Sequence, residues 1–346
     1  MIVERIAEFV AQPARGDFKQ LALAAFAFQY ERIEAYRALC DRRGTTPSRV
    51  TDWRQMPPVP ALAFKSLALY AAEPREIFRS SGTTASSRST HHHPFPDLYR
   101  AVIDASFPDG CLAPLRQPPM LSLIPSREQA PDSSLAFMLD HVLRTHGAPD
   151  SLVAFGPRGV ETRAARSFLA ARQRDRRPTL ILATTFALVE LLDSLERLDL
   201  RFRLPVESKL FETGGTKGHT RQVSRDELVE RLADRLALPR EAIVHEYGMT
   251  ELTSQCYTAS GPGADPQVFL PPPWVRVRIL EPESLQEQPP GEPGLIAIFD
   301  LANVGSALHL LTEDLGATRG EGFRLLGRAA GAELRGCSLT VEELTG

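Results

Sequence analysis

The strongest constraint on the fold is the alternation of short apolar runs with amphipathic stretches from Met120 onward. The runs at 121–124 (LSLI) and 179–185 (TLILATT) have the length and composition of buried strands. Apolar residues at helical spacing follow each run, and Ser224 with Glu227 forms a capping-box pattern before another helical stretch. Strands that alternate with helices in this way predict an α/β architecture whose sheet is covered by helices.

The two ends of the chain have different patterns of apolar residues. Residues 18–43 carry apolar side chains at helical spacing and predict a helical segment near the N-terminus. After Pro271 the helical pattern gives way to strand-like runs at 274–280, 294–301 and 323–327. These runs predict a β-rich subdomain over 271–326, a small antiparallel barrel or sheet attached to the α/β body.

Composition excludes several classes of protein. Lys and Arg number 40 and Asp and Glu number 43, and the formal net charge of −3 argues against a nucleic-acid-binding protein. The longest uncharged hydrophobic stretch, 178–189, is shorter than the roughly 20 apolar residues that a membrane span needs. The charges within MIVERIAEFV are not those of a signal peptide. The four cysteines, Cys40, Cys111, Cys256 and Cys337, form no CxxC pair, so we expect a reduced, cytoplasmic protein.

Three segments carry residue types suited to a nucleotide. Segment 78–93 (FRSSGTTASSRSTHHH) supplies hydroxyls, backbone amides and Arg88, as a polyphosphate requires, although it is not a Walker P-loop. Segment 210–218 (LFETGGTKG) has two adjacent glycines that let the backbone approach a flat ligand closely. Segment 245–257 (HEYGMTELTSQCY) offers an aromatic ring, a hydroxyl and a carboxylate. Taken singly, each segment is equally typical of a polar loop, a turn or a buried loop.

In order and residue type, these segments resemble the phosphate-loop, adenine-facing and Tyr-Gly-x-Thr-Glu motifs of the adenylate-forming, acyl-CoA synthetase-like superfamily. Two later segments also fit: 312–316 (TEDLG) resembles the Thr-Gly-Asp segment, and 327–331 (GRAAG) resembles the Gly-Arg motif. Within the superfamily, the chain is most similar to the acyl-protein synthetases of bacterial fatty-acid reductase complexes, the LuxE family. The stretches that carry this similarity are SLIPSREQAPDSSLAFM (122–138), FETGGTKG (211–218), EYGMTELTSQCY (246–257), FDLANV (299–304) and LGRAAGAELRGCSLTVEEL (326–344).

The resemblance implies a domain organisation and a set of site residues. It implies an adenylation domain over 1–326, of mixed sheets covered by helices with the β-rich subdomain, and a short segment at 327–346 in place of a full lid. The residues implied for the phosphates are Ser80, Ser81, Gly82, Thr83 and Thr84, with Arg88 as a nearby cation. Those implied for the adenine are Gly214, Gly215 and Tyr247, and those for the ribose side are Asp314 and Arg328. Gly248 is implied in binding the nucleotide. Thr250 and Glu251 are implied in catalysis, with Glu251 as the ligand of Mg²⁺.

The reaction implied by the resemblance consumes a fatty acid and ATP and forms acyl-AMP and pyrophosphate. The acyl group then passes to a cysteine of the enzyme and onward to a partner acyl reductase that makes aldehyde. Cys337, in the stretch RGCSL, matches the acylated cysteine of the family, and its neighbours Arg335 and Gly336 favour an accessible thiolate. Cys256 is the alternative, although a cysteine beside a motif is more often a small buried hydrophobe.

Departures from the superfamily pattern leave two other functions open. Ala85 stands where the phosphate loop usually has Gly, the usual loop Lys is missing, and no residue corresponds to the catalytic Lys of the lid. One alternative is transfer of the acyl group to CoA or to carrier-protein phosphopantetheine, with Cys337 idle. The other is a non-catalytic adenylation fold that serves only as a subunit of a reductase assembly.

Two further features of the sequence invite a functional interpretation. His91 and His93 share one face of a predicted strand, but no third ligand is evident, so we expect one of 91–93 to border the phosphate or carboxylate site rather than a metal. The Arg-rich run at 158–177 could receive an acidic partner, but a solvated helix face is the favoured interpretation.

Overall fold

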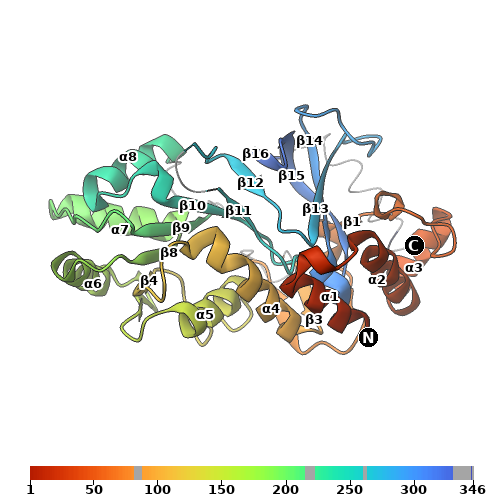
Figure 1. Ribbon diagram of the computed structural model, residues 1–346, viewed down its shortest axis with the longest axis horizontal. Helices are drawn as coiled ribbons and strands as arrows, with labels where there is room; N and C mark the ends of the chain where they lie inside the picture. Colours follow the sequence, from red (N-terminus) through yellow and green to blue (C-terminus); the bar gives the residue numbers. More distant parts are fainter. Residues whose placement is uncertain (82–87, 215–222, 260–262, 330–343, 345–346) are drawn as a thin grey trace.

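A mixed sheet runs through the whole molecule (Figure 1). The computed structural model describes residues 1–81, 88–214, 223–259, 263–329 and 344. Within these residues the sheet has 12 strands in the order β13-β14-β15-β16-β12-β11-β10-β9-β8-β4-β5, and β1 (Val59–Pro60) pairs with β15. One half of the sheet is parallel and the other half antiparallel, which confirms the predicted α/β class.

The parallel half consists of five strands, and all but the one at its outer edge are almost entirely buried. Its members are β4 (Met120–Ser122), β5 (Leu152–Val153), β8 (Leu180–Thr184), β9 (Lys209–Thr213) and β10 (Ile243–Tyr247). Strands β4 and β8 confirm the runs predicted at 121–124 and 179–185. Their near-continuous apolar sequences are typical of a parallel sheet with helices on both sides.

Two groups of helices cover the parallel half. On one face lie α4 (Pro96–Phe107) and α5 (Ser134–His146), and on the other lie α6 (Thr162–Asp175), α7 (Thr185–Arg197) and α8 (Arg225–Leu236). Ser224 caps α8 as predicted, because its hydroxyl accepts a 3.1 Å hydrogen bond from the Glu227 amide. The Arg-rich run contains α6, and its Arg172 is buried and paired with Asp150.

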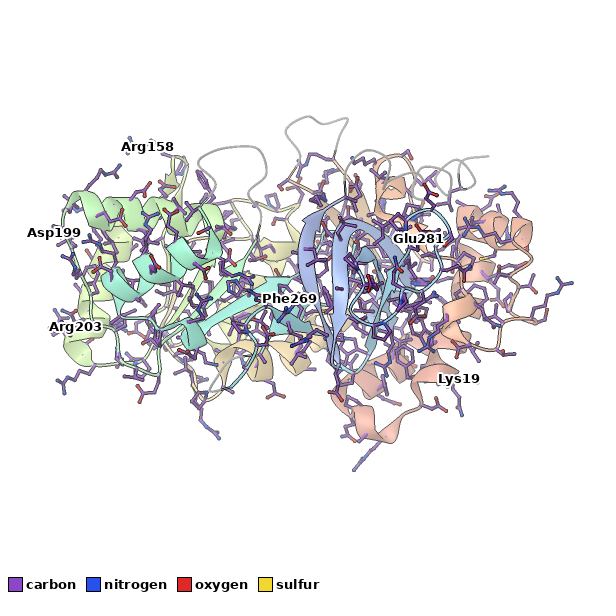
Figure 2. All side chains as sticks on the ribbon, turned by 90° about the horizontal axis from the view of Figure 1, so that it is seen from above. Lys19, Arg158, Asp199, Arg203, Phe269 and Glu281 are labelled. Carbon is purple, nitrogen blue, oxygen red and sulfur yellow. The ribbon has the colours of Figure 1, made fainter. Side chains whose placement is uncertain are left out.

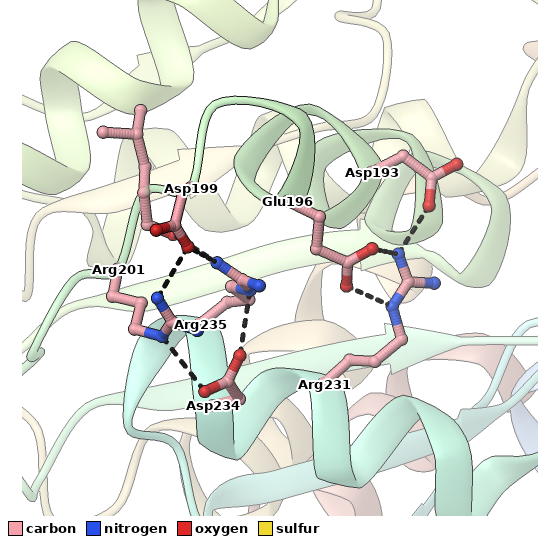
Figure 3. Close-up of polar contacts among 8 residues, drawn as sticks. Asp193, Glu196, Asp199, Arg201, Arg231, Asp234 and Arg235 are labelled. Carbon is pink, nitrogen blue, oxygen red and sulfur yellow. Dashed lines mark hydrogen bonds and ion pairs between the residues drawn. The ribbon is translucent and has the colours of Figure 1, made fainter.

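Ion pairs join α7 to α8 on the outside of the sheet (Figure 3). Arg231 of α8 contacts Asp193 and Glu196 of α7 at 2.5 and 2.7 Å. The second group of pairs in Figure 3 comprises Arg201, Arg235, Asp199 and Asp234. Because their carboxylates are largely exposed, we expect each pair to contribute no more than about 1 kcal/mol to stability.

The antiparallel half continues the same hydrogen-bonded sheet. Its strands are β11 (Cys256–Thr258), β12 (Val268–Leu270), β13 (Val275–Leu280), β14 (Gly294–Asp300), β15 (His309–Arg319) and β16 (Gly322–Arg328). The strands predicted at 274–280, 294–301 and 323–327 are confirmed as β13, β14 and β16. The 11-residue strand β15 was not among the predicted strands, although it contains the TEDLG segment.

The N-terminal helices pack against the antiparallel half. They are α1 (Ile2–Ala11), α2 (Phe18–Arg32) and α3 (Glu34–Arg42), so the helical segment predicted over 18–43 is confirmed with a break at Ile33. Buried Gln29 of α2 donates 3.1 Å hydrogen bonds to the carbonyls of Asn303 and Val304 in the 3₁₀ helix η7 (Leu301–Gly305). These bonds tie the beginning of the chain to the segment that supports the candidate site.

The parallel and antiparallel halves of the sheet lie toward opposite ends of the molecule. Figure 2 shows Arg158, Asp199 and Arg203 at one end, Lys19 and Glu281 at the other, and Phe269 of β12 between them. No helix in the described ranges combines the length and the apolar character that crossing a bilayer requires.

Candidate functional site

The carboxyl ends of β8, β9 and β10 meet at one edge of the sheet, where ligands of open α/β sheets usually bind. Strand β9 ends at Thr213, directly before the Gly214 segment, and β10 ends at Tyr247, directly before Gly248. In the register of these two strands, Glu246 lies opposite Thr213. Two of the segments predicted to face the adenine are therefore neighbours.

A second relationship connects the end of β10 to the antiparallel half. The Tyr247 hydroxyl donates a 2.8 Å hydrogen bond to Asp314 Oδ2 on β15. Arg328 of β16 lies opposite Asp314 in the strand register, with its Nε 3.6 Å from Asp314 Oδ1. The ring of Tyr247 is buried and meets Phe323 edge to face at 5.3 Å. The structure thus brings together three residues, one from each of three motifs.

The histidine run connects the phosphate-loop hairpin to the loop that carries Thr250 and Glu251. Strands β2 (Glu76–Arg79) and β3 (Thr90–His93) form this hairpin. His91 Nδ1 lies 2.8 Å from the carbonyl of Thr250. Burial lowers the pKa of His91 to about 4, so the ring is neutral at pH 7 and its Nδ1–H donates to that carbonyl. His91 therefore contacts the backbone of the loop that carries Thr250 and Glu251.

Side chains from β14 and η7 fix the loop at 250–254 through hydrogen bonds. Asn303 donates from Nδ2 to the Glu251 carbonyl at 2.9 Å and accepts at Oδ1 from the Thr253 hydroxyl at 2.9 Å. Because the Thr253 proton is used in this bond, His93 donates from Nε2 to Thr253 Oγ1 at 3.0 Å. The Glu251 side chain is itself buried. Its backbone is fixed by a network of side chains that lies far away in the sequence.

Asp300 anchors the same loop through its carboxylate. It accepts hydrogen bonds from the amides of Thr253 and Ser254 at 3.1 and 2.8 Å and from the Ser254 hydroxyl at 2.7 Å. Burial raises the pKa of Asp300 to about 6 despite these bonds. Trp274 Nε1 donates to Ser254 Oγ at 2.9 Å and completes the support.

Two carboxylates at the edge of the sheet were not predicted from the sequence. Glu212 of β9 contacts His245 Nδ1 at 2.7 Å and accepts a hydrogen bond from Thr185. Burial raises the pKa of Glu212, but the hydrogen bond and the charge of His245 outweigh it, and the pKa lies below its usual value. Burial raises the pKa of Glu246 to about 7. The signal in the sequence is a charged residue inside an otherwise apolar strand, in KLFET and IVHEY.

The phosphate-loop hairpin is closed at its base by Ser80 and Arg88. The Ser80 amide donates to the Ser89 carbonyl at 3.0 Å, and the Ser89 amide donates to Ser80 Oγ at 2.9 Å. The Arg88 guanidinium donates to the Ser80 carbonyl and lies 3.1 Å from Asp132. Ser81 is exposed. The predicted residues Gly82, Thr83 and Thr84 lie outside the described residues, as does Ala85.

The glycines of the site differ in their surroundings. A Cβ at Gly214 meets no atom of the described residues within 4 Å, so these residues leave room for a ligand beside the backbone there. A Cβ at Gly248 would lie 1.9 Å from Glu246 Oε1, which excludes any larger residue while the carboxyl group stays in place. Gly215 lies outside the described residues.

The cysteines within the described ranges are all buried. Burial raises the pKa of Cys40 to about 12 and raises the pKa values of Cys111 and Cys256 as well. A buried thiol with a raised pKa is a poor nucleophile, which disfavours Cys256 as an acyl carrier. Cys337 lies outside the described residues.

No cluster of metal ligands is found among the described residues of this edge. Among the described residues, no three His, Cys, Asp or Glu side chains are grouped so that they could hold a metal ion. A single carboxylate such as Glu251 still fits Mg²⁺, because that ion usually binds one or two carboxylates together with substrate phosphates. Two surface hollows of about 440 and 630 Å³ lie near α6, away from the predicted site residues.

Comparisons with known proteins identify the family of this chain. The family model "Acyl-protein synthetase, LuxE" matches residues 166–345. The long-chain-fatty-acid–luciferin-component ligase of Vibrio harveyi is 21% identical over 340 residues, which cover 94% of this chain and 87% of that protein.

Solved structures of adenylate-forming ligases share the fold. A 2-hydroxyisobutyryl-CoA ligase, solved with 2-HIB-AMP and CoA, has a TM-score of 0.65 at 13% identity, covering 90% of this chain and 69% of its own. A long-chain-fatty-acid–CoA ligase from Archaeoglobus fulgidus has a TM-score of 0.50 at 16% identity, covering 73% and 51%. Since the family model spans more than half of the 346 residues, this chain belongs to the LuxE family of acyl-protein synthetases.

Proposed function

We propose that this protein uses ATP to activate a carboxylic acid, in particular a long-chain fatty acid, as an acyl adenylate. The observation that carries the proposal is the meeting of Tyr247, Asp314 and Arg328 at the carboxyl end of β10. A carboxylate and a guanidinium at this edge suit a ribose and a phosphate, and the family and the fold agree with that ligand.

The nucleotide would lie across the edge of the parallel strands. Gly214 and Gly215 would line the adenine, Tyr247 would border the base, and Gly248 would allow the turn beside it. Asp314 would accept hydrogen bonds from the ribose hydroxyls, with Arg328 beside it. The phosphates would lie against the hairpin loop, in contact with Ser80, Ser81, Gly82, Thr83 and Thr84, and with Arg88 at its base.

The first half-reaction is an in-line displacement at phosphorus. A carboxylate oxygen of the fatty acid attacks the α-phosphorus of ATP, the bond to the bridging oxygen breaks, and pyrophosphate leaves with the electron pair. The protein contributes position and electrostatic stabilisation, because little covalent chemistry falls to its own groups. Thr250 and Glu251 would face the phosphates from the loop that Asn303 and Asp300 hold in place. Mg²⁺, bound by the Glu251 carboxylate, would neutralise charge on the phosphate oxygens.

The second half-reaction would transfer the acyl group to Cys337. Its thiolate attacks the carbonyl carbon of the acyl adenylate, AMP leaves, and a thioester forms on the enzyme. A partner acyl reductase would then take the acyl group and make aldehyde. Residues 1–326 would form the adenylation domain, with 271–326 as its β-rich part, and 327–346 would carry the acceptor thiol. A reduced thiol in this role fits a cytoplasmic location.

Intact-protein mass spectrometry after incubation with ATP, Mg²⁺ and a long-chain fatty acid tests the transfer. We expect an acyl adduct on the wild-type chain that hydroxylamine removes. Cys337→Ser should lose the adduct and keep acid-dependent ATP–pyrophosphate exchange, whereas Cys256→Ser, the matched control, should keep both.

An acyl adduct of unchanged yield on Cys337→Ser would contradict the assignment of Cys337. Formation of acyl-CoA without any adduct on the chain would favour transfer to CoA instead.

A further inference from the structure

Glu246 is a buried carboxylate at the edge of the sheet, on the face toward α4. Only 8% of the residue is exposed. Thr213, its neighbour across the parallel register, donates a hydrogen bond from Oγ1 to Glu246 Oε2. This side-chain bond joins the last residue of β9 to β10, directly before the two glycine segments.

The second carboxylate oxygen of Glu246, Oε1, lies beside Gly248, the residue that follows Tyr247. A Cβ at Gly248 would come within 1.9 Å of Glu246 Oε1, so the carboxyl group fills the space where a side chain at 248 would lie. The carboxyl group is therefore in contact with both segments proposed to face the adenine. Its Oε1 occupies the space beside Gly248 in one segment. Its Oε2 accepts the hydrogen bond from Thr213, directly before Gly214 in the other segment.

The surroundings of Glu246 differ from those of two other buried carboxylates, Glu212 and Asp300. Glu212 has a histidine and a threonine as partners, and Asp300 accepts hydrogen bonds from backbone amides and a hydroxyl. Among the described residues, Thr213 is the one hydrogen-bond donor to Glu246. A buried carboxylate with a single neutral donor is unfavourable for folding, and an apolar or amide side chain would fill the same space at lower cost. This cost points to a role in binding rather than in stability.

The charge of Glu246 changes near neutral pH. Burial raises its pKa to about 7, and the nearby charge of Glu212 acts in the same direction. The other titratable groups that interact with it are Tyr99 of α4, Cys111 of the turn after α4, and Cys256 and Tyr257 of β11. Burial raises the pKa of each of these groups, so they stay uncharged at pH 6 to 8.

We propose that Glu246 is a positioning residue that holds the two adenine-facing segments together, and that ATP binds more tightly when Glu246 is ionised. The inference rests on the proposed ATP site. In the ionised form, the bond from Thr213 is charge-assisted and stronger, so the ends of β9 and β10 stay in register. Protonation weakens this bond and loosens the segments, and the affinity for ATP falls as the pH is lowered from 8 to 6.

Calorimetric titration with ATP at pH 6, 7 and 8 tests the proposal without depending on acyl transfer. For the wild-type protein we expect the Kd for ATP to rise about tenfold from pH 8 to pH 6, the size of one charged hydrogen bond. Glu246→Gln keeps the shape of the side chain and should bind ATP weakly at pH 8, with a Kd that is flat across this range. Thr213→Val should also weaken binding at pH 8, and Glu190→Gln on the outer helix α7 should behave like the wild type.

Two results would overturn the proposal. One is a wild-type pH dependence that persists in full in Glu246→Gln, which would assign the titration to another group. The other is an unchanged Kd in Glu246→Gln at pH 8, with thermal unfolding showing that the variant is folded. Failure of the proposed reaction would appear differently, as ATP binding that obeys these expectations without any acyl adenylate being formed.

Discussion

The hydroxyl of Tyr247 donates a hydrogen bond of 2.8 Å to the carboxylate of Asp314, and so connects the end of β10 to β15. The two residues belong to different motifs and are 67 positions apart in the sequence. Through this bond, the residue proposed to border the adenine also orients the carboxylate proposed to bind the ribose. The geometry of the nucleotide site thus depends on contacts between the parallel and antiparallel halves of the sheet.

Removal of this hydroxyl tests the connection. In Tyr247→Phe the ring packing against Phe323 is kept, but Asp314 is free to turn away from the ribose. We expect the KM for ATP to rise about fivefold to tenfold, as for the loss of one hydrogen bond of about 1 to 1.5 kcal/mol, with the KM for the acid unchanged. Tyr30→Phe is the matched control, because Tyr30 makes the same kind of bond to Asp41 on the surface. Equal effects of the two variants would contradict the role of Tyr247.

Arg328 and Arg324 on β16 allow a second comparison. Arg328 is about half exposed, and its closest contact with a carboxylate of the described residues is 3.6 Å, so Arg328→Ala should change the free energy of unfolding by less than about 1 kcal/mol. The same variant should raise the KM for ATP at least severalfold. Arg324 pairs with Asp265 at 2.5 Å, and Arg324→Ala should leave the KM for ATP unchanged. Steady-state kinetics and urea unfolding of both variants separate binding from stability, and an unchanged KM in Arg328→Ala would count against its role.

The hydrogen bond from His91 to Thr250 predicts that removal of the ring slows ATP–pyrophosphate exchange by a factor that does not depend on pH. His91→Leu leaves the Thr250 carbonyl without its donor, at a cost of about 1 to 3 kcal/mol, and should slow ATP–pyrophosphate exchange. His91→Asn should retain more activity, because the amide nitrogen of Asn can replace Nδ1. Since burial holds the pKa of His91 near 4, the ratio of wild-type to variant rates should be constant from pH 6 to 8. A ratio that changes across this range would show that the ring titrates. His92→Leu, at the adjacent strand position, serves as the control.

The burial of His309 predicts how the stability of the fold changes as the pH is lowered. Its Nδ1 donates to the Met56 carbonyl at 2.8 Å, and burial lowers its pKa to about 3. Between that value and the ordinary pKa of about 6.5, the unfolded chain binds a proton that the folded protein does not. Stability contributed by neutral His309 is therefore complete above pH 6.5 and is lost progressively below it.

The variant His309→Asn can keep the bond to Met56 without a titratable ring. Its melting temperature should fall less steeply from pH 7 to pH 5 than that of the wild type, even if it is lower throughout. Parallel slopes would contradict a buried, neutral His309.

In the parallel half, β4, β8 and the helix that Ser224 caps could be predicted, because each has its own local pattern. Strand β15 could not, because Thr312, Glu313 and Asp314 interrupt its apolar run. Its place is set by its partners β14, β16 and β1, which supply hydrogen bonds along its length. The pairing of strands, and not the sequence of the strand itself, determines this element.

In the candidate site, too, some features could be predicted from the sequence and others could not. The residues within the motifs were predicted one by one, but the groups that hold them were not. Asn303 supports Glu251 from 52 positions away, and His245 meets Glu212 across the register of two strands that are separated in the sequence by α8. Contacts of this kind depend on register and topology, for which a single sequence carries little signal.

Acid-dependent ATP–pyrophosphate exchange is the most direct test of the central claim, that this protein forms an acyl adenylate. The wild-type protein with ATP, Mg²⁺ and labelled pyrophosphate should incorporate label into ATP only when a long-chain fatty acid is present. Glu251→Gln should abolish this incorporation while the protein remains folded. Absence of exchange with every fatty acid tested, or exchange at the same rate without any acid, would contradict the account.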